Sequence, residues 1–129
     1  VVLGADTSVV FEQQILGKPS NLSECLATLN LLSNNKHQVL TSIAVALNGR
    51  IKSLVVSTDV FFKPLTNKEI ERYWHTGEPQ DKAGAYGIQG IGGQFVKHIQ
   101  GSYSAVVGLP LYETAQLLAQ FNKPTAIQA

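Results

Sequence analysis

Residues 37–62 read HQVLTSIAVALNGRIKSLVVSTDVFF and carry the clearest fold signal in this chain of 129 residues. Two β-rich runs, His37–Leu47 and Ile51–Phe62, flank Asn48-Gly49, a pair typical of a type I′ hairpin turn. In the second run, alternate positions from 54 to 62 are apolar or threonine, as in a strand with one buried face. The sequence therefore predicts two long antiparallel strands joined by a tight turn.

Helices are predicted on both sides of this hairpin. Asn21 to Glu24 and Thr66 to Glu69 have the pattern of capping boxes, in which a polar N-cap residue is followed by Glu at the third helical position. They predict one helix over residues 22–32 and a second, short helix that begins after Thr66 and ends at about residue 75. A third helix is expected from Leu109-Pro110 to about residue 121, because proline suits the first helical turn.

Shorter strands complete the expected sheet. Val1–Ala5 is an apolar run typical of a buried strand, and residues 8–11 continue it or begin another strand. Further strands are expected over residues 94–99 and, as a short strand or buried segment, over 105–107. Together these elements predict one α/β domain over residues 1–129, with a mixed β-sheet flanked by helices.

Composition narrows the class of protein. The chain is 44% hydrophobic and 15% charged, so it is not disordered. Ten basic and nine acidic residues give a net charge of +1, which argues against nucleic acid or an acidic membrane as a partner. No apolar run reaches the ~18 residues of a membrane helix. The single cysteine, Cys25, is expected to be a buried small hydrophobe, and it favours a reducing compartment such as the cytoplasm.

Two charged residues are candidates for chemistry. Asp6 follows the first apolar run, where a carboxylate can hold a metal or activate a water. On this residue alone, a turn-forming aspartate that caps local backbone is the favoured alternative. Lys18 precedes a helix N-terminus, a place that attracts phosphate, although an exposed loop lysine is the commoner reading.

Residues 84–93 contain five glycines, so positive φ angles or close backbone approaches are expected at several of them. The segment matches neither a P-loop nor a dinucleotide-binding fingerprint. Gln89 lies within it and can pair with a base edge or point into solvent. The three histidines have no metal-binding spacing, and His37 is expected to be structural.

Several segments together resemble the Maf family. They occur in the family's order and cover the chain to about residue 121: LGADT (3–7), LGKP (16–19), HQVLT (37–41), GEPQDKAGAYGIQG (77–90), GSY (101–103) and VVGLP (106–110). The resemblance implies the Maf fold, which is similar to that of inosine triphosphate pyrophosphatases. It also implies a nucleotide pyrophosphatase that releases a monophosphate and diphosphate with a divalent cation, Mg²⁺ or Mn²⁺. The resemblance further implies a link to septum formation and cell-division arrest.

The resemblance also assigns roles to residues. The form DKAGAYGIQG at 81–90 is similar to the branch that hydrolyses dTTP and UTP, rather than the branch associated with 7-methyl-GTP. Asp6 falls on the family's proposed proton acceptor and is also the expected metal ligand. Thr7 and Gln89 fall on positions tied to substrate choice. Lys18 and Lys82 match pocket lysines, which we assign to phosphate binding.

The chain departs from the family pattern at its start. Maf proteins open with a first strand and a Ser-Pro-Arg-Arg segment, and nothing here matches them. Since the chain begins at Val1 without methionine, we expect a domain that lacks its N-terminal segment and is weak or inactive alone. The alternative is a non-catalytic module that binds nucleotide or regulates division. A homodimer is a further expectation, because family members often form dimers.

Overall fold

A five-stranded sheet runs through the computed structural model, which describes residues 1–128. The strand order is β2-β1-β3-β4-β5, and neighbouring strands pair antiparallel. The α/β class with flanking helices is confirmed, with an antiparallel sheet among the described residues where the sequence predicted a mixed one. The strands are β1 (Val2–Phe11), β2 (Gln14–Leu16), β3 (Lys36–Leu47), β4 (Arg50–Phe62) and β5 (Val96–Gln100).

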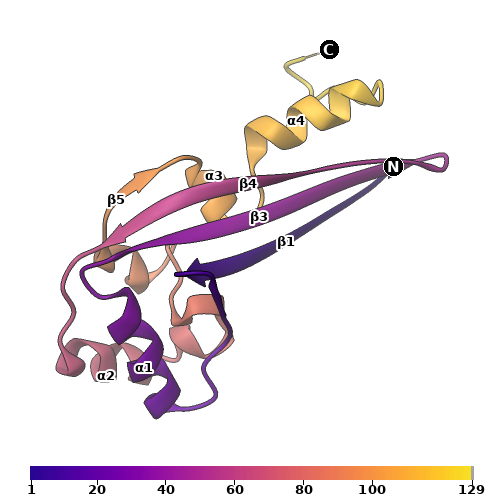
Figure 1. Cartoon of the computed structure of the whole chain (residues 1–129). Coiled ribbons are helices and arrows are strands. Elements are labelled where there is room, and N and C mark those ends of the chain that lie inside the picture. The colour runs from indigo at the N-terminus through magenta and orange to yellow at the C-terminus, as the bar shows by residue number, and fades with distance from the viewer. Residues whose placement is uncertain (129) are drawn as a thin grey trace.

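The helices gather at two places along the long strands. In Figure 1, α1 and α2 lie together at one end, and α4 lies beside the far half of the β3–β4 hairpin. α3 lies between these two groups. The helices are α1 (Leu22–Leu32), α2 (Asn67–His75), α3 (Tyr103–Val107) and α4 (Leu111–Gln120), and short 3-10 segments are η1 (Glu78–Asp81), η2 (Ala83–Ala85) and η3 (Ile91–Phe95). The sequence predicted α1, α2 and α4 correctly.

The β3–β4 turn has the geometry that its sequence predicts. Asn48 and Gly49 have φ angles of 51° and 79°, and Leu47 pairs with Arg50 across the turn. Two consecutive positive φ angles define the type I′ turn, whose twist matches that of the flanking strands. This two-residue connection fixes which side chains of the hairpin share a face.

Nearly all the core lies on one face of the sheet. The buried side chains of β3 are at odd positions from 37 to 45. Of β4, Thr58 pairs with Val39 and Val60 pairs with His37, and both are buried, as is Phe62 two positions further along. We call this side the core face. The opposite side, here called the bare face, carries the intervening side chains, among them Val2, Asp6, Ser42, Ile51 and Val55. Ile51 is 71% exposed and Val55 is 64% exposed, so none of the helices within residues 1–128 covers this part of the bare face.

Two apolar clusters share the core face. The larger one joins α1 and α2 to the sheet around Leu29, Val60 and Phe62. The smaller one joins α4 to Ile43 and Val45 of β3. Each cluster therefore takes side chains from the same hairpin, at different distances from its turn.

α3 lies between the clusters and is fixed by hydrogen bonds to threonines of the sheet. The Thr41 hydroxyl donates to the Ala105 carbonyl at 2.6 Å, and the Thr58 hydroxyl accepts from the Ser102 amide at 3.1 Å. Two alternatives were predicted for residues 105–107, a short strand or a buried segment; the strand is wrong, and Ala105 is fully buried. Ser102 caps a helix there by accepting from the Ala105 amide, and Gly108 ends it at a φ of 132°.

The first strand forms as predicted and continues to Phe11, but the prediction that Val1–Ala5 is buried is wrong. Val2 is 69% exposed and Leu3 is 42% exposed. β2 pairs only with residues 9–11 of β1, so the earlier part of β1 is the outer edge of the described sheet. The strand predicted from residue 94 begins at Val96, because residues 91–95 form a 3-10 turn.

Cys25 is fully buried in α1, and burial raises the pKa of its thiol to about 11. This confirms its interpretation as a small buried hydrophobe, since a protonated thiol is a poor nucleophile. In residues 1–128, none of the helices has the length and apolar character needed to cross a bilayer.

Gly49→Ala tests the role of the turn. Alanine at a φ of 79° is strained, so we expect a loss of about 1–2 kcal/mol in the free energy of unfolding. Urea denaturation measures it. Gly17→Ala is the control, because Gly17 has open space around it and no positive φ. Equal effects of the two substitutions would contradict this account of the turn.

Candidate functional site

A cavity of about 440 Å³ opens on the core face of the sheet. Its volume lies in the range of small-molecule sites. The floor comes from β1 and β3, one wall from the segment between Glu78 and Gly90, and another wall from α3. Side chains that line it include Thr7, Val9, Val39, Lys82, Gln89 and Val106.

Thr7 is oriented by its neighbour in the sheet. It pairs with Thr41, and their hydroxyl oxygens lie 3.2 Å apart. The Thr41 hydroxyl donates to Ala105 in α3, so Thr41 is available only as an acceptor for Thr7. Thr7 therefore donates to Thr41 and keeps acceptor capacity toward the cavity, where a substrate N–H can bind.

The glycine-rich segment lies tightly against the floor. Gly84 has a φ of 72°, and a Cβ there would lie 2.8 Å from Cγ1 of Val9. At Gly90 a Cβ would lie 1.9 Å from a carboxylate oxygen of Glu78. The expectation of positive φ angles or close approaches is confirmed, and the close approach at Gly90 identifies a residue that the sequence analysis did not select.

That residue, Glu78, holds the far side of the segment. Its two carboxylate oxygens accept from the amides of Ile91 and Gly92, both at 2.9 Å, and from the Tyr73 hydroxyl. Tyr73 in turn accepts from the Gly87 amide at 3.1 Å. The only sequence signal for this arrangement was a glutamate shortly before a run of glycines.

Lys82 lines the cavity and is free to meet an anion there. Its Nζ lies 3.6 Å from a carboxylate oxygen of Asp81, and the side chains are 43% and 76% exposed. An ion pair of this kind contributes about 0–1 kcal/mol, so a phosphate can replace it. Lys18 is exposed and does not line the cavity, although the Gly84 amide donates to the Gly17 carbonyl at 3.2 Å and brings the Lys18 turn beside this segment.

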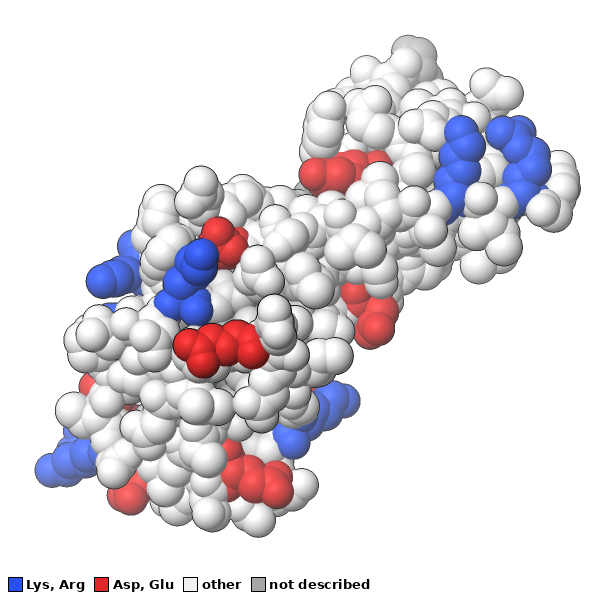
Figure 2. Space-filling view, viewed as in Figure 1, with Lys and Arg blue, Asp and Glu red and all other residues white. Residues whose placement is uncertain are grey.

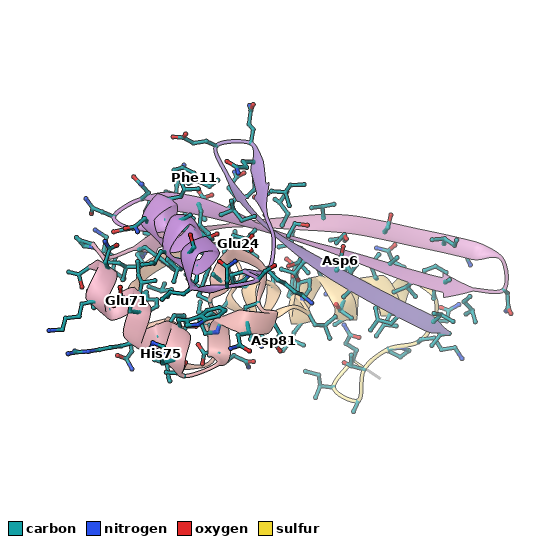
Figure 3. All side chains as sticks on the ribbon, turned by 90° about the horizontal axis from the view of Figure 1, so that it is seen from below. Asp6, Phe11, Glu24, Glu71, His75 and Asp81 are labelled. Atoms are coloured by element: carbon teal, nitrogen blue, oxygen red, sulfur yellow. The ribbon has the colours of Figure 1, made fainter. Side chains whose placement is uncertain are left out.

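Asp6 lies on the other side of the sheet from the cavity. Successive strand residues point to opposite faces, and Thr7 points to the core face, so Asp6 points to the bare face. Its pairing partner is Ser42, and Asp6 is exposed. Figure 3 shows Asp6 on β1, while Asp81 lies among the helical segments. The structure thus brings Thr7, Lys82 and Gln89 together, places Lys18 nearby and leaves Asp6 apart.

The described residues do not form a metal site from protein ligands alone. Among residues 1–128, no three His, Cys, Asp or Glu side chains are grouped so that they could hold an ion. The Glu78 carboxylate already accepts three hydrogen bonds. A cation bound by protein groups alone does not fit these residues.

A buried His–Tyr pair supports the cavity from within the core. Nε2 of His37 lies 2.7 Å from the hydroxyl of Tyr86, which also lines the cavity. His37 packs edge-on against Phe62, and burial lowers its pKa to about 4. Its neutral ring has a structural role, as predicted, although Nδ1 has no hydrogen-bond partner within residues 1–128.

Charges of both signs are scattered over the face of the molecule in Figure 2. Blue and red side chains alternate along it without a large region of one sign. This matches the net charge of +1 and gives no support for a nucleic-acid interface on that face.

Comparisons with known proteins agree with these features. A family model described as Maf-like protein matches residues 1–121. The dTTP/UTP pyrophosphatase of Colwellia psychrerythraea is 69% identical over 118 residues, which are 92% of this chain and 56% of that protein. Those of Pseudoalteromonas atlantica and Pseudoalteromonas translucida are 57% and 61% identical over 95% and 93% of this chain, and 64% of each relative is covered. The chain therefore spans about three fifths of the length of these relatives.

His37 predicts a pH dependence of stability. The pKa of His37 is about 4 in the folded state and near 6.5 in the unfolded state. Between these two values the unfolded state binds a proton at His37 and the folded state does not, so protonation favours unfolding. Stability should fall as the pH drops through this window, by about 2 kcal/mol between about pH 7 and about pH 5. Urea denaturation at both pH values measures it. His37→Gln should remove this share of the loss and exposed His75→Asn should not; the reverse pattern would refute the assignment.

Proposed function

Because the chain belongs to the Maf family, we propose that it hydrolyses dTTP and UTP to the nucleoside monophosphate and diphosphate. Water attacks the α-phosphorus, the bond from that phosphorus to the oxygen bridging the α- and β-phosphates breaks, and diphosphate leaves. The reaction needs an acceptor for the proton of water and positive charge beside the phosphate oxygens. The names of relatives at 57–69% identity support this proposal.

The observation that carries the proposal is the meeting of Thr7, Lys82 and Gln89 in one cavity. A uracil or thymine edge offers acceptor, donor and acceptor in turn. The Gln89 amide has both donors and an acceptor, and the Thr7 hydroxyl keeps an acceptor lone pair. We assign base recognition to Gln89 and Thr7, and phosphate binding to Lys82 with Lys18 nearby.

The role of Asp6 requires a particular path for the substrate. We propose that the triphosphate leaves the cavity past the outer edge of β1, which within residues 1–128 has no strand paired on that side over residues 2–8. Asp6 is exposed next to Thr7 at that edge and acts as proton acceptor there. The divalent cation is proposed to arrive on the triphosphate, with Asp6 as its protein ligand, because Mg²⁺ is commonly held by one or two carboxylates together with substrate phosphates.

A second function is favoured by the same position of Asp6. A carboxylate outside the cavity suits a module that binds nucleotide without hydrolysing it, or that regulates division. A cytoplasmic location and a homodimer remain part of the proposal. The first is supported by the unpaired, buried Cys25, and the second by the family resemblance.

Asp6→Asn separates the two functions. In the longer protein that includes the Ser-Pro-Arg-Arg segment expected before Val1, we expect release of diphosphate from dTTP and UTP with Mg²⁺ or Mn²⁺, and the substitution should lower kcat at least about a hundredfold while dTTP binding is retained. Glu12→Gln, at another exposed carboxylate of the β1–β2 hairpin, is the control. Nucleotide binding without turnover in the unmodified protein would favour the non-catalytic module, and an unchanged rate in Asp6→Asn would remove Asp6 from its role.

Gln89→Leu tests base recognition. Losing the amide should weaken discrimination between UTP and CTP by about tenfold, because a polar site rejects a mismatched edge mainly through unpaired groups. The ratio of kcat/KM for the two nucleotides measures it. Gln94→Leu is the control, since Gln94 is exposed and outside the cavity. Equal ratios in all three proteins would refute the assignment, and 7-methyl-GTP as the preferred substrate would overturn the proposed branch.

A further inference from the structure

The backbone around Gln89 is held by one partly buried network of hydrogen bonds. The Glu78 carboxylate accepts from the amides of Ile91 and Gly92 on one side of Gln89, while the Tyr73 hydroxyl accepts from the amide of Gly87 on the other. Tyr73 donates to Glu78, so the two acceptors form one unit. Both ends of the segment Gly87–Gly92 are therefore attached to a single carboxylate.

The glycines of this segment make the attachment sterically feasible. A Cβ at Gly90 would lie 1.9 Å from Oε1 of Glu78, and one at Gly92 would lie 2.6 Å from the Tyr73 hydroxyl oxygen. Neither residue has a positive φ, so close approach rather than backbone conformation explains the requirement for glycine. The segment and the carboxylate fit each other.

The network is buried and closely packed on the side of Tyr73 and exposed to solvent on the side of Gln89. Tyr73 is 2% exposed and packs edge-on against Phe95, with ring centroids 4.9 Å apart. Burial, followed by the hydrogen bond to Glu78, raises the pKa of Tyr73. Burial tends to raise the pKa of Glu78, but hydrogen bonds from Tyr73 and the Gly92 and Ile91 amides lower it overall, so the carboxylate is ionised at neutral pH. Gln89 is exposed.

We propose that Glu78 is a positioning residue, which through Tyr73 and the amides of residues 87–92 sets where Gln89 meets the base of the substrate. This inference rests on the proposed function for its consequence, but the attachment itself is independent of it. Glu78 lines the same cavity, and its hydrogen bonds to the amides of Ile91 and Gly92 hold the recognition segment in place, so we assign it positioning rather than contact with the reacting phosphates. Its loss should therefore weaken substrate binding more than the chemical step.

Glu78→Gln tests this with almost no change in size. The amide of glutamine has one acceptor oxygen, so its NH₂ group meets an N–H donor where a carboxylate oxygen accepted. We expect hydrogen exchange at the Ile91 and Gly92 amides to accelerate about tenfold. KM for dTTP should rise about tenfold with kcat changed less than about twofold.

Glu71→Gln is the matched control, because Glu71 is an exposed carboxylate of neighbouring α2. Tyr73→Phe is a second variant, which is expected to accelerate hydrogen exchange at the Gly87 amide. It tests the same network if Glu78→Gln fails to fold. Unchanged exchange at these amides would overturn the attachment. A fall in kcat with unchanged KM would overturn the positioning role. If the unmodified protein shows no turnover, the affinity for dTTP is measured in each variant in place of KM. A failure of the proposed function can then be distinguished from a failure of this inference.

Discussion

The pairing register of β3 and β4 is the constraint on which the rest of the structure depends. The turn at Asn48-Gly49 sets Leu47 opposite Arg50, and from there each pair follows to Lys36 opposite Phe61. Because side chains alternate between faces, a slip of one residue would move every buried side chain of the hairpin to the solvent side. Both apolar clusters and the helices that cover them are built on this single alignment.

The same register places the polar groups of the cavity. Val39 enters the floor and pairs with Val9, and two positions further along Thr41 pairs with Thr7. Thr41 is fully buried, so its hydroxyl must be satisfied within the protein. It bonds to Thr7 on the adjacent strand and to Ala105 above the sheet, and thereby joins the cavity floor to α3.

Local signals predicted most of the fold because they depend on neighbours in the chain. The hairpin turn and the capping box at Thr66 formed as expected. Asn21 caps its helix by accepting from the Glu24 amide, but the Glu24 carboxylate accepts from the Ser20 amide, so only half of the predicted box is present there. For Ala105–Val107 a short strand was one of two predictions, because its valines favour that state, whereas Ser102 and the sheet threonines determine a helix. Burial of Val1–Ala5 was inferred from apolarity alone, which does not reveal that the strand lies at a sheet edge.

The residues of the site could be predicted only in part from the sequence. The resemblance selected Thr7, Lys82 and Gln89, which the fold brings to one cavity. That Asp6 points to the opposite face follows from strand alternation, but only once the pairing of β1 is known. Glu78 was missed because its partners are backbone amides thirteen and fourteen residues away, and amides leave no signal in the sequence.

The division of the core into two clusters gives the molecule two separately packed units on one hairpin. The outer unit consists of α4 and the strand ends around the turn, where Arg50 stacks over Phe121 and Lys52 donates to Gln120. Since its buried residues are distinct from those beneath the cavity, we expect that local unfolding of α4 would leave the cavity intact. Protection from hydrogen exchange by the proposed nucleotide should accordingly not extend to α4, so the stability of the outer unit would vary independently of the affinity for that ligand.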